Sequence, residues 1–334
     1  MHGLMIRDHA LHLYLFSMPD IYGKDNFLDF DEDDPEQHQH LHDGFEIKSA
    51  GNFLATLVAG RSVHGLYPTI GGFNHFPDAT GIQAAIMKLE AARPAVLRLI
   101  DVFANTSTFH FDRQTHYLAL IPDRYGFLTG NICRSESETI PKAKFREHLE
   151  HVVLPYSQAS AYKHEQHSYM VGALARMNLA KDKLHPKTKD TLGTLLDRFP
   201  STDIFDNNLA QAIEVLHCVD DAMEILKTKK FAPEPVVKKP YAAGTGVGVI
   251  EAPRGTLFHK VEIDDQGIVT VGEVIVPTNQ NQINIEEDIS TMVERFLPDT
   301  DKAKLEFEIE KLIRAYDPCM SCAAHFLKVR WDKT

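Results

Sequence analysis

Residues 314–325, Arg-Ala-Tyr-Asp-Pro-Cys-Met-Ser-Cys-Ala-Ala-His, carry the most specific chemistry in this chain. Pro318 restrains the backbone directly before Cys319, so we expect the preceding helix to end there. The two-residue spacer lets the thiolates of Cys319 and Cys322 face one ion, and His325 repeats that spacing. By itself the cysteine pair fits half of a zinc site, a redox dithiol or half of a larger metal site.

The other two cysteines do not complete such a site convincingly. Cys133 and Cys218 stand alone in the sequence, and we expect both to be small buried side chains rather than ligands. A zinc site would need a second pair, and a thioredoxin-like dithiol would follow a strand rather than a helix. Four cysteines in 334 residues also exclude a disulfide framework.

The composition is that of an acidic globular protein. The 334 residues are 43% hydrophobic and 25% charged, which allows one large domain or two ordinary ones. The formal charge of −12 argues against a nucleic-acid binder and against an anionic membrane surface as partner. We see no apolar run long enough for a direct membrane span and no secretory signal, so we expect a cytoplasmic protein.

Hydrophobic periodicity predicts a mainly α, α+β chain. The expected helices cover residues 4–18, 46–62, 80–104, 145–180, 185–198, 204–227, 284–296 and 301–315. Pro19 is expected to end the first helix, whose His9 and His12 have a spacing that suits a metal but are better explained as packed core histidines. We expect the acidic, histidine-containing stretch 25–46 to be a solvated loop rather than a metal site, and residues 105–145 to form loops and short strands.

The pattern changes after Leu226. A short basic run at 227–230 and three following prolines predict a connection without regular structure. Residues 245–278 then alternate in polarity around Asp264-Asp265-Gln266-Gly267, a sequence typical of a hairpin turn. We therefore predict a small antiparallel β element, which a central parallel sheet flanked by helices would contradict.

Five segments, in this order, resemble motifs of the large subunit of nickel–iron hydrogenases. They are the Asp-His-x-x-His helix within 7–20, the segment 168–178, Glu251-Ala252-Pro253-Arg254-Gly255, Pro277-Thr278-Asn279-Gln280-Asn281 and the Asp-Pro-Cys-x-x-Cys-x-x-His motif at 317–325. Taken singly, only the last motif is a strong indication of this family. The five motifs in this order are a strong indication together. The fourth, with the acidic residues that follow it, is most similar to the cytoplasmic NAD(P)-linked branch, including the sulfhydrogenase type.

The resemblance implies one hydrogenase large-subunit domain over residues 1–334. Its expected parts are a mostly helical region 1–227, a β element 245–278, C-terminal helices with the metal-ligand segment 284–325, and a tail 326–334 that a maturation protease could remove. The implied activity is reversible oxidation of H₂ to protons and electrons.

The resemblance also implies roles for the cysteines and for a cation above them. Cys319 would be a terminal nickel thiolate, and Cys322 would bridge nickel and an Fe(CN)₂CO unit. Arg254 would place its guanidinium over the metals, with Asp8 as its carboxylate partner. The alternatives are a turn arginine paired with Glu251 and an aspartate that only caps its helix.

Further residues would surround the iron and a magnesium ion. Pro253, Pro277 and Thr278 would line the diatomic ligands of the iron, where a hydroxyl group can donate to cyanide. The alternative for the Pro-Thr pair is a buried turn that ends a strand. His325 would ligate the magnesium ion, and the alternative is an ordinary histidine at a helix end.

The resemblance also implies partner proteins. This chain has too few cysteines to hold an iron–sulfur cluster of its own. A small subunit would hold the iron–sulfur clusters, and diaphorase subunits with flavin would reduce NAD(P)⁺. A maturation protease and nickel-insertion proteins would complete the site.

One departure concerns the nickel site. The family holds nickel with two Cys-x-x-Cys pairs, the first in an N-terminal Arg-x-Cys-x-x-Cys context, and this sequence contains only the second. We therefore expect an N-terminally truncated large subunit that is inactive alone. The rival interpretations are a hydrogenase-derived structural subunit without a complete metal site, and a small zinc or redox module.

Overall fold

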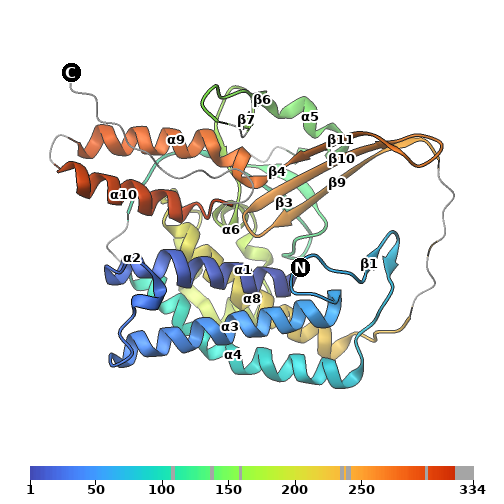
Figure 1. Cartoon of the computed structure of the whole chain (residues 1–334), viewed down its shortest axis with the longest axis horizontal. Coiled ribbons are helices and arrows are strands. Elements are labelled where there is room, and N and C mark those ends of the chain that lie inside the picture. The colour runs from blue at the N-terminus through green and yellow to red at the C-terminus, as the bar shows by residue number, and fades with distance from the viewer. Residues whose placement is uncertain are drawn as a thin grey trace.

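The computed structural model describes residues 1–106, 110–135, 139–157, 160–233, 237, 242–297 and 300–319. Long helices that pack against one another form one layer of the fold (Figure 1). They are α1 (His2–His12), α3 (Pro35–Ala59), α4 (Ala79–Asn105) and α8 (Asp206–Thr228). Because α8 packs against both α1 and α4, it is buried along most of its length, and it is the helix predicted over 204–227.

The first helix does not end at Pro19. A π-helical turn, Leu13–Ser17, follows α1, and α2 (Met18–Tyr22) continues in the same direction until Gly23, whose φ is +61°. Pro19 lies in the first turn of α2, where a missing backbone N–H is tolerated. The helical path is therefore longer than predicted, and a left-handed glycine ends it.

The expected loop over 25–46 is wrong for its second half. Asp34 caps α3 by accepting from the backbone N–H groups of Glu36 and Gln37 at 2.9 and 3.0 Å, and Pro35 is its first residue. His40 is buried and lies 2.8 Å from the hydroxyl oxygen of Tyr22. The acidic composition therefore marks a helix start, not a solvated loop.

The helix predicted over 145–180 is also wrong for most of its length. That range holds α5 (Phe145–His148), β6 (Glu150–Val152), β7 (Ala161–Lys163), β8 (Tyr169–Met170) and α6 (Ala173–Ala180). Its apolar residues pack in a second core against strands from elsewhere in the chain, among them Phe145 on Phe258. Tertiary contacts therefore override the local periodicity.

Short strands within the 1–227 region form a sheet of their own. Its order is β5 (Thr139–Ile140), β4 (Asn131–Arg134), β3 (His116–Ile121) and β8, with β3 and β8 parallel. β6 pairs with β7, and β1 (Pro68–Thr69) pairs with β2 (Gly72–Phe73). The single helix predicted over 185–198 is divided into α7 (Pro186–Leu192) and a 3₁₀ segment, Gly193–Arg198. Other 3₁₀ turns are Phe27–Asp29, Lys142–Lys144 and Lys181–Lys183.

The predicted antiparallel β element is confirmed. β9 (Gly244–Ala252), β10 (Gly255–Ile263) and β11 (Val269–Ile275) form a three-stranded sheet in the order β11-β10-β9. α9 (Pro277–Phe296) and α10 (Lys302–Ala315) then lead back over the helical layer toward α1 (Figure 1). The mainly helical α+β class is confirmed. In the described part of the chain, no helix has the length and apolarity needed to cross a membrane.

Candidate metal centre

The end of α10 is fixed by side chains from distant helices. The backbone carbonyl of Arg314 lies 2.7 Å from Nε2 of His12, and the carbonyl of Ala315 accepts from Nδ2 of Asn207 at 2.8 Å. Arg314 itself forms a bidentate ion pair with Asp20 of α2, at 2.9 and 2.8 Å. α10 ends directly before the Asp-Pro-Cys motif, as the proline predicted, and its last carbonyls are satisfied by α1 and α8.

Asp317, two residues before Cys319, is the partner of Arg254. Nε of Arg254 donates to the backbone carbonyl of Asp317 at 3.0 Å, and an Nη lies 3.0 Å from its carboxylate. The other carboxylate oxygen accepts from Nε2 of Gln211 at 3.0 Å. The φ of Asp317 is +52°, a left-handed conformation that a non-glycine residue keeps only when its surroundings enforce it.

The charge around Arg254 is strongly negative. Burial alone would lower the pKa of Arg254, yet Asp317, Asp8 and Cys319 raise it above its ordinary value. Glu251, the partner that a simple turn arginine would use, pairs with Arg176 instead. Arg254 therefore faces the C-terminal motif and not its own turn.

Cys319 meets the start of α9. Its backbone N–H donates to Oγ1 of Thr278 at 3.0 Å. Thr278 is buried, and Pro277 before it is the first residue of the helix. The alternative of a turn that only ends a strand is therefore wrong, because a proline at the first helical position starts α9 here.

Asp8 lies within α1, so it is not a helix cap. Its carboxylate accepts from Nε of Arg7 at 2.6 Å, and Arg7 also donates to the carbonyl of Ser62. Asp8 is one of the negative charges that raise the pKa of Arg254. Pro253 is buried one residue before Arg254.

The predicted residues Cys322 and His325, with the tail 326–334, lie outside the described residues. The structure thus brings Arg254, Thr278 and Cys319 together with Asp8 nearby, although 311 positions separate the first from the last of them in the sequence. Cys319 supplies one thiolate, the soft donor that nickel and low-spin iron need. A fixed guanidinium beside it can compensate the negative charge of a thiolate-bound group. These surroundings fit a thiolate-bound metal group.

Comparison with known proteins agrees with this geometry. Residues 135–325 match the family model described as nickel-dependent hydrogenase. The alpha subunit of sulfhydrogenase 1 from Pyrococcus furiosus is 30% identical over 332 residues, which are 98% of this chain and 76% of that protein.

The chain belongs to the nickel-dependent hydrogenase family.

Other relatives support this membership. The beta subunit of the NAD-reducing hydrogenase HoxS from Cupriavidus necator is 25% identical, over 97% of this chain and 74% of its own length. A crystal structure of an NAD⁺-reducing [NiFe]-hydrogenase in the H₂-reduced state superposes with a TM-score of 0.76 over 97% of this chain and 78% of that chain. At 22% identity, that similarity concerns the hydrogenase fold.

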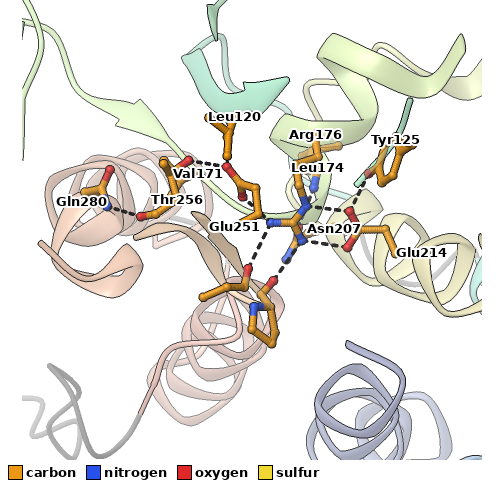
Figure 2. A network of polar contacts seen from close by, with 12 residues as sticks. Leu120, Tyr125, Val171, Leu174, Arg176, Asn207, Glu214, Glu251, Thr256 and Gln280 are labelled. Atoms are coloured by element: carbon orange, nitrogen blue, oxygen red, sulfur yellow. Dashed lines mark hydrogen bonds and ion pairs between the residues drawn. The ribbon is translucent and has the colours of Figure 1, made fainter. Parts of the chain in front are cut away.

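A buried ionic network in this hydrogenase chain contacts the turn that carries Arg254 (Figure 2). Arg176 of α6 forms a bidentate pair with Glu214 of α8, at 2.6 and 2.7 Å, and a third bond with Glu251 of β9 at 2.7 Å. All three side chains are at most 1% exposed. The sequence did not predict this network, although apolar neighbours on both sides of Arg176 and of Glu214 indicated that these two side chains are buried.

The two carboxylates of the network have different environments. Burial favours neutral Glu214, but Arg176 outweighs it and holds the pKa of Glu214 well below its ordinary value. Burial raises the pKa of Glu251, and Arg176 only partly offsets this effect. Glu251 also accepts from Oγ1 of Thr256 at 2.6 Å and from the backbone N–H of Leu120 at 2.7 Å. The network therefore satisfies each charged group with several donors or acceptors.

The histidines of α1 are core residues, as predicted. His9 is fully buried, and its Nε2 lies 2.8 Å from Glu214. His12 is buried with Nδ1 2.6 Å from Oε1 of Gln211. Cys218 is a buried free thiol whose pKa is raised by burial, and Cys133 is a half-buried free thiol packed on the core.

A second cluster has the composition of a metal site. Ligand atoms of His2, His217 and Asp221 lie within 4.8 Å of one another, the one such group found among the described residues. However, Nδ1 of His217 accepts from the backbone N–H of His185 at 3.1 Å. A neutral ring then carries its proton on Nε2, which cannot ligate a metal in that state. The cluster is therefore explained by the ion pair of His2 with Asp221 at 2.8 Å.

We expect His217 to make the protein less stable in mild acid. Burial, helped by His2, lowers the pKa of His217 from 6.5 to about 4. Below pH 6.5 His217 binds a proton in the unfolded chain but not in the folded chain. About 2 kcal/mol of the free energy of unfolding is therefore lost between pH 6.5 and 5. Urea unfolding at several pH values, compared with His217→Gln, measures this loss. A variant with the same pH slope as the parent chain would contradict the prediction.

Proposed function

We propose that this chain is the large subunit of an enzyme that oxidises H₂ reversibly to protons and electrons. The observation that carries the proposal is the convergence of Arg254, Thr278 and Cys319 around Asp317, from three distant segments. Membership in the nickel-dependent hydrogenase family supports it. The retained thiolate beside a fixed cation favours an enzyme over a structural subunit.

In this proposal Cys319 and Cys322 would hold nickel, Cys322 would also hold the Fe(CN)₂CO unit, and His325 would hold magnesium. The metal group, when bound, supplies the heterolytic cleavage of H₂. Arg254 keeps a positive charge over the site because Asp317 orients its guanidinium and Asp8 adds a negative field. Pro253 and Pro277 shape the walls that face the diatomic ligands.

Thr278 has a donor left for this group. Its Oγ1 accepts the N–H of Cys319, and a hydroxyl group that accepts can still donate its own proton. Its O–H is therefore suited to a cyanide acceptor on iron. The same contact fixes the backbone at Cys319, so one side chain serves both the ligand loop and the iron ligands.

We further propose that the electrons pass to iron–sulfur clusters on a small subunit and then to NAD(P)⁺ through flavin-containing diaphorase subunits. The name of one relative, the NAD-reducing hydrogenase HoxS, supports this acceptor. A maturation protease and nickel-insertion proteins would complete the subunit, and the cytoplasm would be its compartment.

We expect the 334-residue polypeptide, purified alone, to contain no stoichiometric nickel. It provides one Cys-x-x-Cys pair, and two thiolates leave half of the nickel coordination to solvent. Metal analysis, infrared spectra in the region of metal-bound CO and cyanide, and H₂ uptake with an artificial dye should all be negative. Both metals and H₂ uptake in this polypeptide would contradict the expectation.

The complementary experiment tests the activity itself. The chain is produced with a segment that supplies an Arg-x-Cys-x-x-Cys pair, a small subunit and the maturation proteins. Nickel, the infrared bands and H₂ uptake should then appear together, and Cys322→Ser should abolish uptake. A fully metallated assembly that takes up no H₂ would overturn the proposed activity and favour a structural subunit.

A further inference from the structure

We propose that Arg176 is a positioning residue, which holds the turn from Glu251 to Gly255 so that Arg254 meets Asp317. The inference rests on the proposed role of Arg254. Arg176 touches none of the candidate metal ligands that the structure describes; it would act through the turn that Arg254 belongs to.

One guanidinium binds three consecutive residues of this turn (Figure 2). Nη1 of Arg176 donates to the carboxylate of Glu251 at 2.7 Å and to the carbonyl of Ala252 at 3.3 Å. Nη2 donates to the carbonyl of Pro253 at 3.0 Å. The planar fork of an arginine fixes direction as well as distance, so the backbone that enters Arg254 has little freedom.

The other side of the same guanidinium is bound to α8. Glu214 accepts from Nε and Nη2 of Arg176, and Gln211, three positions earlier on that helix, donates to Asp317. Residues three apart lie on one face of a helix. α8 therefore holds both partners of the Arg254–Asp317 contact, one through Gln211 and the other through Glu214 and Arg176.

The network also reaches the helix that carries Asp8. Glu214 lies 2.8 Å from Nε2 of His9, the residue that follows Asp8 in α1. The turn is held from its far side as well, because Nε2 of Gln280 donates to the carbonyl of Thr256 at 2.6 Å. Arg176 thus binds the turn directly, and it is linked to α1 through Glu214 and to α9 through Glu251 and Thr256.

Stability alone does not explain this arrangement. Burying three ionised side chains costs desolvation energy that the pairing only partly recovers, and hydrophobic replacements of such networks are often neutral or stabilising. Here all five N–H donors of Arg176 have acceptors. Two of these acceptors are the backbone carbonyls of Ala252 and Pro253, the two residues that precede Arg254. This specificity in direction is what a positioning role requires.

The test uses Arg176→Lys in the full 334-residue chain, with Arg93→Lys as matched control. Arg93 forms a bidentate pair with buried Asp220, also on α8 but away from the turn. We expect hydrogen exchange of the amides of Ala252 and of residues 254–256 to accelerate at least about tenfold in Arg176→Lys. In the control these amides should exchange as in the parent chain, while α4 and α8 near Arg93 exchange faster.

A second measurement connects the turn to the reaction. In the assembled enzyme, Arg176→Lys should lower kcat for H₂ oxidation by about 10²-fold at unchanged metal content, since small misplacements of a catalytic group have effects of this size. Arg93→Lys should change kcat less than threefold. If the assembled parent enzyme has no activity, the exchange experiment still decides the positioning role.

Two results would overturn the inference. One is parent-like exchange at 252–256 in Arg176→Lys, and the other is faster exchange there without any loss of kcat in an active assembly. Should Arg176→Lys fail to fold by circular dichroism, Glu251→Gln replaces it, since that change weakens one turn contact and keeps the side-chain shape. The same two results in Glu251→Gln would then count against Arg176 as the positioning residue.

Discussion

Arg254→Lys is expected to lower the rate of H₂ oxidation by about 10²- to 10³-fold, the usual effect of losing one preorganised donor at a reaction centre. A lysine keeps the charge but lacks the planar fork with which Arg254 meets both the carboxylate and the carbonyl of Asp317, at 3.0 Å each. The cation would therefore lose its direction toward Cys319. The assay is H₂ uptake with an artificial dye in the assembled enzyme.

The control for this variant is Arg124→Lys. Arg124 also pairs with an aspartate, Asp221, but it is 66% exposed, and exposed pairs contribute little. Its rate should stay within twofold of the parent enzyme. Nickel content and the infrared bands must be equal in all three proteins, so that a loading defect is not read as a catalytic one. Equal rates for Arg254→Lys and Arg124→Lys would remove the support for a catalytic arginine.

Gly255→Ala is expected to destabilise the folded chain by at least about 3 kcal/mol. Two causes add together, because alanine is strained at the positive φ of this position and its methyl group would be too close to neighbouring atoms. The φ of Gly255 is +136°, a backbone conformation that residues with a side chain rarely adopt. A Cβ atom there would lie 2.5 Å from Cγ2 of Val171 and 2.9 Å from the backbone nitrogen of Gly172. The turn and the start of α6 would have to separate, and the position of Arg254 would change with them.

The matched control is Gly248→Ala in the neighbouring strand. A Cβ atom at Gly248 would have nothing within 4 Å, and the residue lies in the regular backbone of β9. Replacing glycine in a strand removes unfolded-state entropy, so this variant should be as stable as the parent or more stable by about 0.5–1 kcal/mol. Urea unfolding of both variants gives the comparison, and similar losses in both would contradict the close approach at Gly255.

Local sequence was sufficient for several elements and insufficient for others. The alternation and the hairpin turn at 264–267 predicted β9 to β11 because both are local properties of the chain. The range 145–180 was misassigned because its apolar residues pack against strands from other segments. Around Pro19, a π-helical turn lets the helix pass a residue that usually ends one.

The order of short motifs along the chain determined the family and the fold class. The residue types at Arg254, Thr278 and Cys319 determined what kind of site was possible, because a guanidinium, a hydroxyl and a thiolate have a fixed chemistry wherever they lie. Only the tertiary structure decided which groups meet. It paired Arg254 with Asp317 instead of Glu251, and it placed Arg176 behind that turn. These pairings join residues 63 to 77 positions apart, and contacts of that kind depend on how helices and strands pack, which no local pattern of residues encodes.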